Sequence, residues 1–171
     1  MTRTAILYYS RSGTTKKLAE ALGEALDAQV IAIGCPRYSG GWLGYVFAAV
    51  DSLRGRMPDI DIPAISWSDF DRVVLGSPIW TSYPATPLRS FLQGCPDLPG
   101  RVALFLTSGG HSPQEKAVEM VAGLLPKPLE ATLALPEAQV KAGTIDAAVA
   151  RFVAELDAGN VGAQTETPPG A

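Results

Sequence analysis

The chain has 171 residues, a hydrophobic content of 47% and a formal net charge of −3. This length and hydrophobic content are typical of one folded domain and argue against general disorder. The balanced charge lacks the basic excess that would indicate nucleic-acid binding, and the single histidine nearly excludes a histidine-rich metal site.

No segment indicates export or insertion into a membrane. The first apolar run, residues 4–9, is too short for the core of a signal peptide. No apolar stretch approaches the length of a membrane-spanning helix. We therefore expect a cytoplasmic protein without a membrane span.

Five short apolar segments alternate with amphipathic segments along the chain. The expected strands are residues 4–9, 29–33, 72–76, 102–107 and 131–135. The expected helices cover roughly residues 14–27, 42–54, 85–93, 113–124 and 144–157. The first, third and fourth strands are almost continuously apolar, which is typical of parallel strands covered on both faces.

Two of the expected helices carry apolar residues at helical spacing, which predicts a buried face on each. In the second helix these residues are Leu43, Val46, Phe47, Val50 and Leu53. In the last helix they are Ile145, Val149, Phe152, Val153 and Leu156. We expect both faces to be buried.

The alternation of strands and helices predicts an α/β protein, a three-layer sandwich around a doubly wound five-stranded parallel sheet of order 2-1-3-4-5. Ligands of such sheets bind outside the carboxyl ends of the strands, at the switch point between the first and third strands. We assign residues 1–157 to this domain. Residues 158–171 lack apolar periodicity and predict a disordered tail.

The turn after the first strand combines hydroxyl groups with a glycine before a helix: Ser10, Arg11, Ser12, Gly13, Thr14 and Thr15. Backbone N–H groups, hydroxyl donors and the positive end of the helix dipole would together favour a phosphate group. The turn has neither the GxxxxGK[ST] nor the GxGxxG pattern, and it contains no cysteine. The alternative is an ordinary helix cap by Ser12 or Thr14.

The loop after the third strand, Ser77–Pro84, contains Trp80 and Tyr83. Two aromatic side chains on such a loop cannot both reach the core easily, so at least one is expected to line the cleft. Trp80 offers a flat surface on which a planar ring can stack. The alternative is that both rings pack against neighbouring helices.

The loop after the fourth strand, 107–111, contains two glycines and the only histidine. Gly109 and Gly110 allow the main chain to approach a ligand closely. The alternative is a glycine turn that leads into a helix capped by Ser112. His111 is a candidate to donate a hydrogen bond to a ring carbonyl or to protonate a substrate, and a surface histidine is the alternative.

The chain resembles the flavodoxin-like family of FMN-binding proteins at these three turns, in YYSRSGTTKKLAEAL, GSPIWTSYPATPLRSFL and VALFLTSGG. The resemblance implies that the FMN phosphate is held by Ser10, Ser12, Gly13, Thr14 and Thr15. It also implies that the isoalloxazine is surrounded by Pro78, Ile79, Trp80, Thr81, Ser108 and Gly109. To this predicted cofactor-binding set we add their neighbours Arg11, Ser77, Gly110 and His111.

Two departures from the electron carriers of that family favour two-electron chemistry, and the arginines among them also favour an enzyme. Those carriers are strongly acidic around the flavin, whereas the segment 35–58 carries Arg37, Arg54 and Arg56. The Ser77–Pro84 loop also contains no glycine, which the carriers often use there. We therefore predict an FMN-dependent oxidoreductase of the NAD(P)H/quinone type, which transfers two electrons from a reduced nicotinamide or other donor to a quinone-like acceptor.

Two other classes of function are weighed against this prediction. One is a flavodoxin that carries single electrons between redox protein partners without being an enzyme. The other is a scaffold that has lost FMN, which the intact set of hydroxyl groups in the first turn argues against. The segment 42–47 is either a homodimer contact or packs within the chain.

Overall fold

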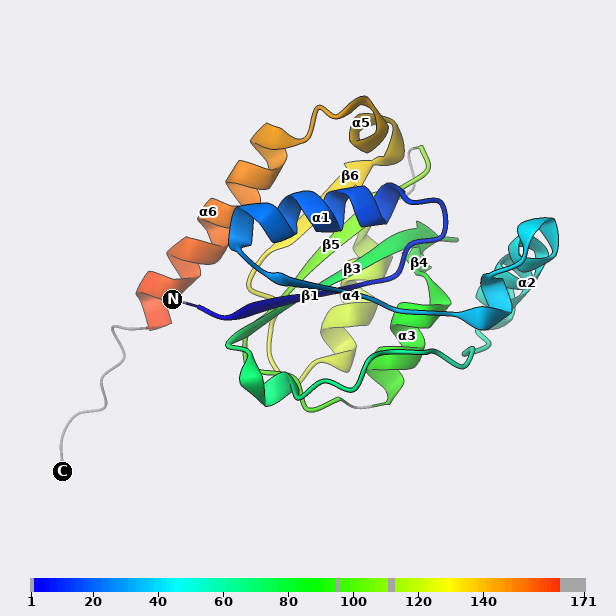
Figure 1. Cartoon of the computed structure of the whole chain (residues 1–171), viewed down its shortest axis with the longest axis horizontal. Helices are drawn as coiled ribbons and strands as arrows, with labels where there is room; N and C mark the ends of the chain where they lie inside the picture. Colours follow the sequence, from blue (N-terminus) through cyan, green and yellow to red (C-terminus); the bar gives the residue numbers. More distant parts are fainter. Residues whose placement is uncertain (1, 95, 111–112, 164–171) are drawn as a thin grey trace.

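The centre of the protein is a sheet, seen in a computed structural model that describes residues 2–94, 96–110 and 113–163 (Figure 1). Its strands are β1 (Thr4–Tyr8), β2 (Gln29–Ala32), β3 (Arg72–Trp80), β4 (Tyr83–Pro84), β5 (Val102–Ser108) and β6 (Thr132–Pro136). Five of them are parallel in the order β2-β1-β3-β5-β6. The predicted fold and strand order are confirmed, and the short antiparallel strand β4 is added beside β3.

Helices cover both faces of this sheet. They are α1 (Thr14–Leu26), α2 (Gly41–Arg54), α3 (Thr86–Gln93), α4 (Glu115–Leu124), α5 (Glu137–Ala142) and α6 (Asp146–Ala163), with 3-10 turns η1 (Pro36–Tyr38) and η2 (Trp67–Asp69). Figure 1 shows α1, α5 and α6 on one side and α3 and α4 on the other. None of the helices within the described ranges is long and apolar enough to cross a membrane.

The apolar strands divide their side chains between two cores. In β1, Ala5 and Leu7 belong to the core under α3 and α4, whereas Ile6 belongs to the core under α1 and α6. Successive strand residues point to opposite faces, so a strand buried on both faces must be apolar at nearly every position. This requirement explains why the sequence predicted the inner strands well.

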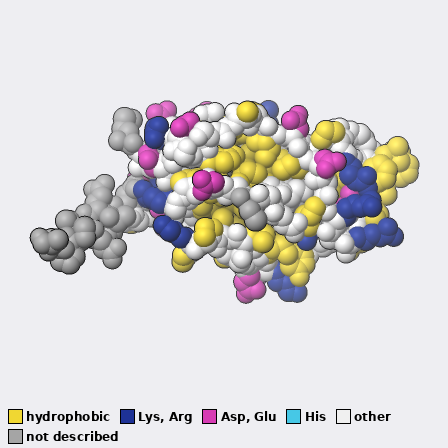
Figure 2. All heavy atoms as spheres, turned by 90° about the horizontal axis from the view of Figure 1, so that it is seen from below, with side chains coloured by type: hydrophobic (Ala, Val, Ile, Leu, Met, Phe, Trp, Pro, Cys, Tyr) yellow, Lys and Arg dark blue, Asp and Glu magenta, His cyan; other side chains and the backbone are white. Residues whose placement is uncertain are grey.

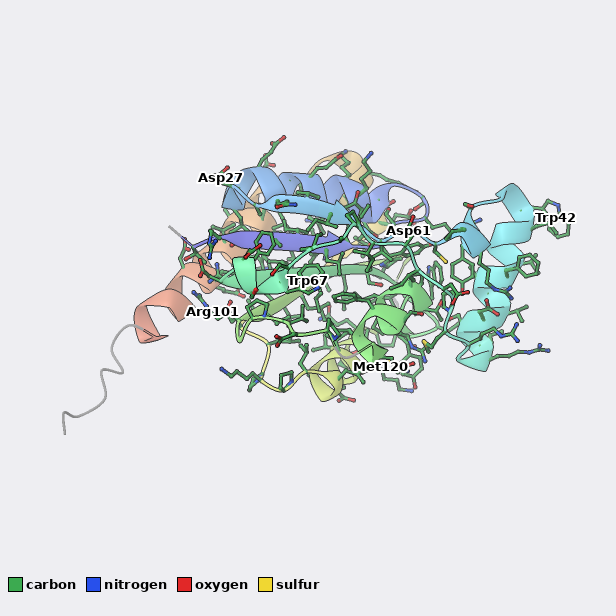
Figure 3. The ribbon with its side chains drawn as sticks, turned by 60° about the horizontal axis from the view of Figure 1, so that its bottom comes forward. Asp27, Trp42, Asp61, Trp67, Arg101 and Met120 are labelled. Atoms are coloured by element: carbon green, nitrogen blue, oxygen red, sulfur yellow. The ribbon has the colours of Figure 1, made fainter. Side chains whose placement is uncertain are left out.

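Helix α2 differs from the prediction. The prediction that its apolar face is buried is wrong. Leu43, Val46, Phe47 and Leu53 are exposed, and Leu53 keeps 75% of its surface accessible to solvent. Figure 1 shows α2 beyond the end of the sheet, and Figure 3 shows Trp42 pointing away from the body. Helical spacing identifies an apolar face, but it does not supply a surface that covers it.

Helix α6 buries its predicted apolar face, with only Val153 left half-buried. It continues to Ala163, so residues 158–163, which were expected to begin a tail, are helical. The remaining tail residues, 164–171, lie outside the described part of the chain.

The buried side chain of Arg72 ties the start of β3 both to α6 and to Glu130, which precedes β6. Arg72, at 1% exposure, donates from Nε to Glu130 Oε2 at 2.7 Å and from Nη2 to the backbone oxygen of Leu156 at 2.8 Å. Glu130 also pairs with Arg101. Because Arg72 has both a carboxylate and a carbonyl partner, its charge is tolerated in the interior.

Candidate functional site

The first turn places the N-terminus of α1 at the carboxyl end of β1. Gly13 precedes the helix with φ of 89°, a left-handed conformation that glycine adopts without steric cost, and its N–H donates to Ser10 Oγ at 3.2 Å. No side chain caps the helix at this position. The alternative of an ordinary cap by Ser12 or Thr14 is therefore wrong, and the first-turn N–H groups, which have no partner inside a helix, face the cleft end of the sheet.

The hydroxyl groups of this turn donate to a carboxylate that the sequence analysis missed. Thr14 Oγ1 donates to Glu137 Oε1 at 2.7 Å, and Ser12 Oγ donates to the same oxygen at 3.3 Å. Lys141 Nζ lies 2.9 Å from that oxygen as well. The ammonium group of Lys141 and then the hydroxyl of Thr14 hold the pKa of Glu137 below its usual range.

A buried pair of hydroxyl groups joins the first turn to β5. Thr15 Oγ1 and Thr107 Oγ1 lie 2.7 Å apart, and both residues are buried. This bond fixes the start of α1 against the end of β5, so the first and third loops keep a constant spacing.

The second loop is a tight hairpin. Strand β3 runs on through Trp80, which pairs with Tyr83 across a two-residue turn. The two turn residues, Thr81 and Ser82, have φ of 50° and 71°, values that L residues with side chains rarely adopt. Ser77 is fully buried, and its Oγ accepts from the N–H of Ala85 at 2.9 Å, so its side chain closes the hairpin and does not line the cleft.

Trp80 is held edge-on by two tyrosine rings. Its ring centroid lies 5.7 Å from that of Tyr9 at an interplanar angle of 88°, and 5.8 Å from that of Tyr38 at 66°. Trp80 is half-buried and also lines the cleft. Trp80 therefore does both things that were expected as alternatives. It packs against neighbouring side chains, and it still presents indole surface to the cleft.

Helix α2 forms the outer wall of the cleft and is fixed by polar contacts. Asp51 is 1% exposed and accepts from Arg37 Nε at 2.5 Å and from the Tyr38 hydroxyl at 3.1 Å. Ser52 Oγ lies 3.0 Å from Thr81 Oγ1, which joins α2 directly to the hairpin turn. Figure 2 shows hydrophobic side chains next to Lys and Arg at the α2 end of the molecule.

These elements enclose a cleft of about 470 Å³ at the carboxyl ends of the strands. Of the predicted cofactor-binding residues, it is lined by Arg11, Ser12, Thr14, Thr15, Pro78, Ile79, Trp80, Thr81, Ser108 and Gly109. It is also lined by residues that the sequence did not single out for binding: Ala48, Ala49, Ser52, Leu53, Thr107 and Glu137.

Four predicted residues of the described chain do not line the cleft: Ser10, Gly13, Ser77 and Gly110. Ser10 and Gly13 shape the first turn, and Gly110, with φ of 89°, shapes the third loop, where its carbonyl accepts from Ser108 Oγ at 3.4 Å. His111 lies outside the described residues.

The donor set suits a phosphate group. An anion, the Glu137 carboxylate, already sits on the Ser12 and Thr14 hydroxyls beside the start of α1. The residues that hold this carboxylate are of the kinds that hold phosphate elsewhere. Within the described residues, no group of His, Cys, Asp or Glu side chains is arranged to bind a metal ion.

Several solved structures are similar to this chain. The chain is similar to the flavoprotein from Lactobacillus acidophilus NCFM crystallised with FMN, at 27% identity and a TM-score of 0.68, covering 83% of this chain and 98% of that chain. The NMR structure of the apo-form of that flavoprotein is similar at 28% identity and a TM-score of 0.63, covering 78% of this chain and 92% of that chain. The chain is also similar to a protein from Bacteroides eggerthii DSM 20697, at 21% identity and a TM-score of 0.66, covering 86% of this chain and 98% of that chain.

No family model matches the chain, and no curated protein matches it either. The sheet order, the cleft at the switch point and the structural likenesses define a doubly wound α/β protein with a small-ligand site at the strand ends. The chain has the flavodoxin-like fold.

Proposed function

We propose that this protein is an FMN-dependent oxidoreductase that moves two electrons from a reduced nicotinamide or other donor to a quinone-like acceptor. The observation that carries the proposal is the cleft itself, which joins an anion site at the start of α1 to a flat wall at Trp80. A ligand with a phosphate at one end and a planar ring at the other matches both parts. The similar flavoprotein that was crystallised with FMN supports FMN as that ligand.

Each part of the cleft has a role in this proposal. The hydroxyls of Ser12 and Thr14 and the first N–H groups of α1 hold the phosphate. The walls formed by residues 78–81 and by Ser108 and Gly109 hold the ring, with the Trp80 indole fixed by Tyr9 and Tyr38. FMN supplies the redox chemistry when bound, and the chain supplies position and electrostatics.

Helix α2 supports an enzyme over a carrier. Its apolar side chain Leu53 borders the cleft, because it lines the cleft and keeps 75% of its surface exposed. An apolar border beside the ring favours a small planar acceptor. The alternative remains a carrier that exchanges single electrons with protein partners.

Oxidation of NADH and NADPH by the FMN-loaded protein, with a soluble quinone as acceptor, separates these two functions. Repeated turnover by the purified protein alone supports the oxidoreductase. A protein that takes up FMN and yet turns over only when a reductase and an acceptor protein are added is a carrier. A cytoplasmic location and a homodimer contact through residues 42–47 stay predictions.

Binding of the ring is tested by a titration with FMN, followed by the loss of flavin fluorescence. We expect Trp80→Ala to weaken FMN binding about three- to tenfold, because an aromatic contact contributes about 0.5–1.5 kcal/mol beyond its area. Trp67→Ala is the control, because Trp67 packs against Phe70 and Phe91 and lies outside the cleft lining. Equal affinities for the wild type and Trp80→Ala would contradict the stacking role.

A further inference from the structure

The phosphate part of the cleft contains an acidic residue that the proposed function does not use. Glu137 is the first residue of α5 and follows β6 directly. Its Oε1 accepts from Thr14 and Ser12 and pairs with Lys141, at 2.7, 3.3 and 2.9 Å. A single carboxylate oxygen thus receives three donors, two of which belong to the turn that would hold a phosphate.

The second carboxylate oxygen reaches toward the third loop. Glu137 Oε2 is the nearest atom to a Cβ built on Gly109, at 3.9 Å. The carboxylate of Glu137 therefore lies between the first and the third loops. Its side chain is 31% exposed, so it lies at the mouth of the phosphate part and is not fixed in the core.

A phosphate cannot use the Thr14 and Ser12 hydroxyls while Glu137 holds them. The two anions would also repel each other at hydrogen-bond distance. From this geometry, and resting on the proposed FMN function, we propose that Glu137 is an internal competitor for the phosphate subsite and sets how tightly the phosphate of the flavin is retained.

Lys141 can remain the partner of the Glu137 carboxylate after a phosphate has displaced it from the hydroxyls. It is four residues farther along the same helix and already bonds to Glu137, so a rotation of the Glu137 side chain can release the hydroxyls and keep the ion pair. The Lys141 backbone oxygen accepts from Lys17 Nζ at 3.4 Å, which adds a second cation near the same turn. A third cation near this turn is Arg11, which lines the cleft and donates to the Gly41 oxygen at 3.1 Å.

The competitor role and a purely structural role predict opposite signs. If Glu137 only supports the fold of the turn, its removal weakens FMN binding. If it competes, Glu137→Gln tightens FMN binding, and we expect a gain of about tenfold, the size expected when a charge-assisted contact no longer has to be broken. Riboflavin, which has no phosphate, should bind the wild type and Glu137→Gln within about twofold of each other.

The test is a set of fluorescence titrations of the full chain with FMN and riboflavin. The variants are Glu137→Gln, Glu137→Ala and the control Glu24→Gln, which makes the same charge change at an exposed position near the far end of α1. Glu137→Ala removes the competitor without adding an amide donor, so tighter FMN binding by both variants supports competition. Tighter binding by Glu137→Gln alone, or weaker binding by both, overturns it.

Glu137→Asp covers the case in which the other variants do not fold. It keeps the charge and shortens the side chain by one methylene. We therefore expect its FMN affinity to lie between that of the wild type and that of Glu137→Gln. An unchanged affinity in this variant counts against the proposal.

A second readout separates failure of this proposal from failure of the proposed function. Inorganic phosphate should raise the melting temperature of Glu137→Gln more than that of the wild type. FMN binding to the wild type with no change in any Glu137 variant overturns the competitor alone. Absence of binding by FMN and by phosphate in every variant overturns both proposals.

Discussion

At the scale of single residues, the site contains backbone conformations that its sequence does not favour. Thr81 and Ser82 both have positive φ, although this kind of hairpin turn prefers Asn and Gly at these positions. The sequence alone showed that this loop has no glycine. It could not show that two residues with side chains adopt the left-handed region there, because that conformation is imposed by the pairing of Trp80 with Tyr83.

Replacing Ser82 with glycine should relieve this strain. A residue with a Cβ in the left-handed region costs about 1–2 kcal/mol, and part of the gain is lost to the greater freedom of glycine in the unfolded chain. We expect Ser82→Gly to raise the free energy of unfolding by about 0.5–1 kcal/mol, measured by urea denaturation. Ser82→Ala removes the hydroxyl and keeps the Cβ, so it should give no gain. A loss of stability in Ser82→Gly would show that the turn is not strained.

The same scale shows why Glu137 was missed. Its partner Thr14 is 123 residues away in sequence, and a single acidic residue after a strand has no pattern of its own. The hydroxyl groups of the first turn were recognisable because four of them cluster within six positions. The sequence therefore predicted the donors of the anion site but not the acceptor that they hold.

At the scale of elements, prediction succeeded where burial forces a pattern and failed where contacts are few. The inner strands were recognisable because both faces are buried. Strand β4 has two residues and α5 has six, so neither is long enough to show a period. Helix α2 has a clear apolar period, yet most of that face is exposed, because the helix packs through Ala48 and the polar group of Asp51.

The attachment of α2 should depend on pH through Asp51. Burial raises the pKa of Tyr38 to about 12, so its hydroxyl stays protonated and donates to Asp51. The Arg37 guanidinium, with this hydroxyl, holds the pKa of Asp51 below its usual range. The contribution of Asp51 is therefore complete above its unfolded pKa of about 3.9 and is lost as the pH falls through the lower folded pKa.

Hydrogen exchange of the α2 amides, corrected for intrinsic rates, measures this effect. In the wild type, we expect protection of residues 41–54 to fall as the pH drops below about 4. Asp51→Asn should lower that protection already at pH 7 and should remove most of its change with pH. Asp59→Asn, at an exposed position, is the control and should behave as the wild type does. Equal protection in Asp51→Asn and the wild type at pH 7 would mean that α2 is held by other contacts.

At the scale of the whole molecule, stability depends on the closure of α6 over the sheet. Arg72 connects the start of β3 with Glu130 and with the backbone of α6. Removing the carboxylate would leave a buried guanidinium without its charge partner, which costs about 3–5 kcal/mol in known cases. We expect Glu130→Gln to lower the free energy of unfolding by about 3 kcal/mol in urea denaturation.

A double variant separates the loss of the pair from the loss of packing. Arg72→Met combined with Glu130→Leu removes both charges, and replacement of a buried pair by apolar groups is often close to neutral. We therefore expect the double variant to be more stable than Glu130→Gln alone. A loss below about 1 kcal/mol in Glu130→Gln would place this pair among the weak ion pairs of protein surfaces.

The projecting position of α2 divides the protein into two cooperative units of unequal strength. The sheet and its flanking helices share two continuous apolar cores. Among the α2 side chains that the structure describes, Ala48 alone belongs to these cores, and Asp51 and Ser52 join the helix through polar contacts. An element with few buried apolar contacts opens at a lower free energy than the core. The wall of the cleft should thus open and close many times for each global unfolding event. A melting curve reports the core and carries almost no information about the lifetime of the closed cleft.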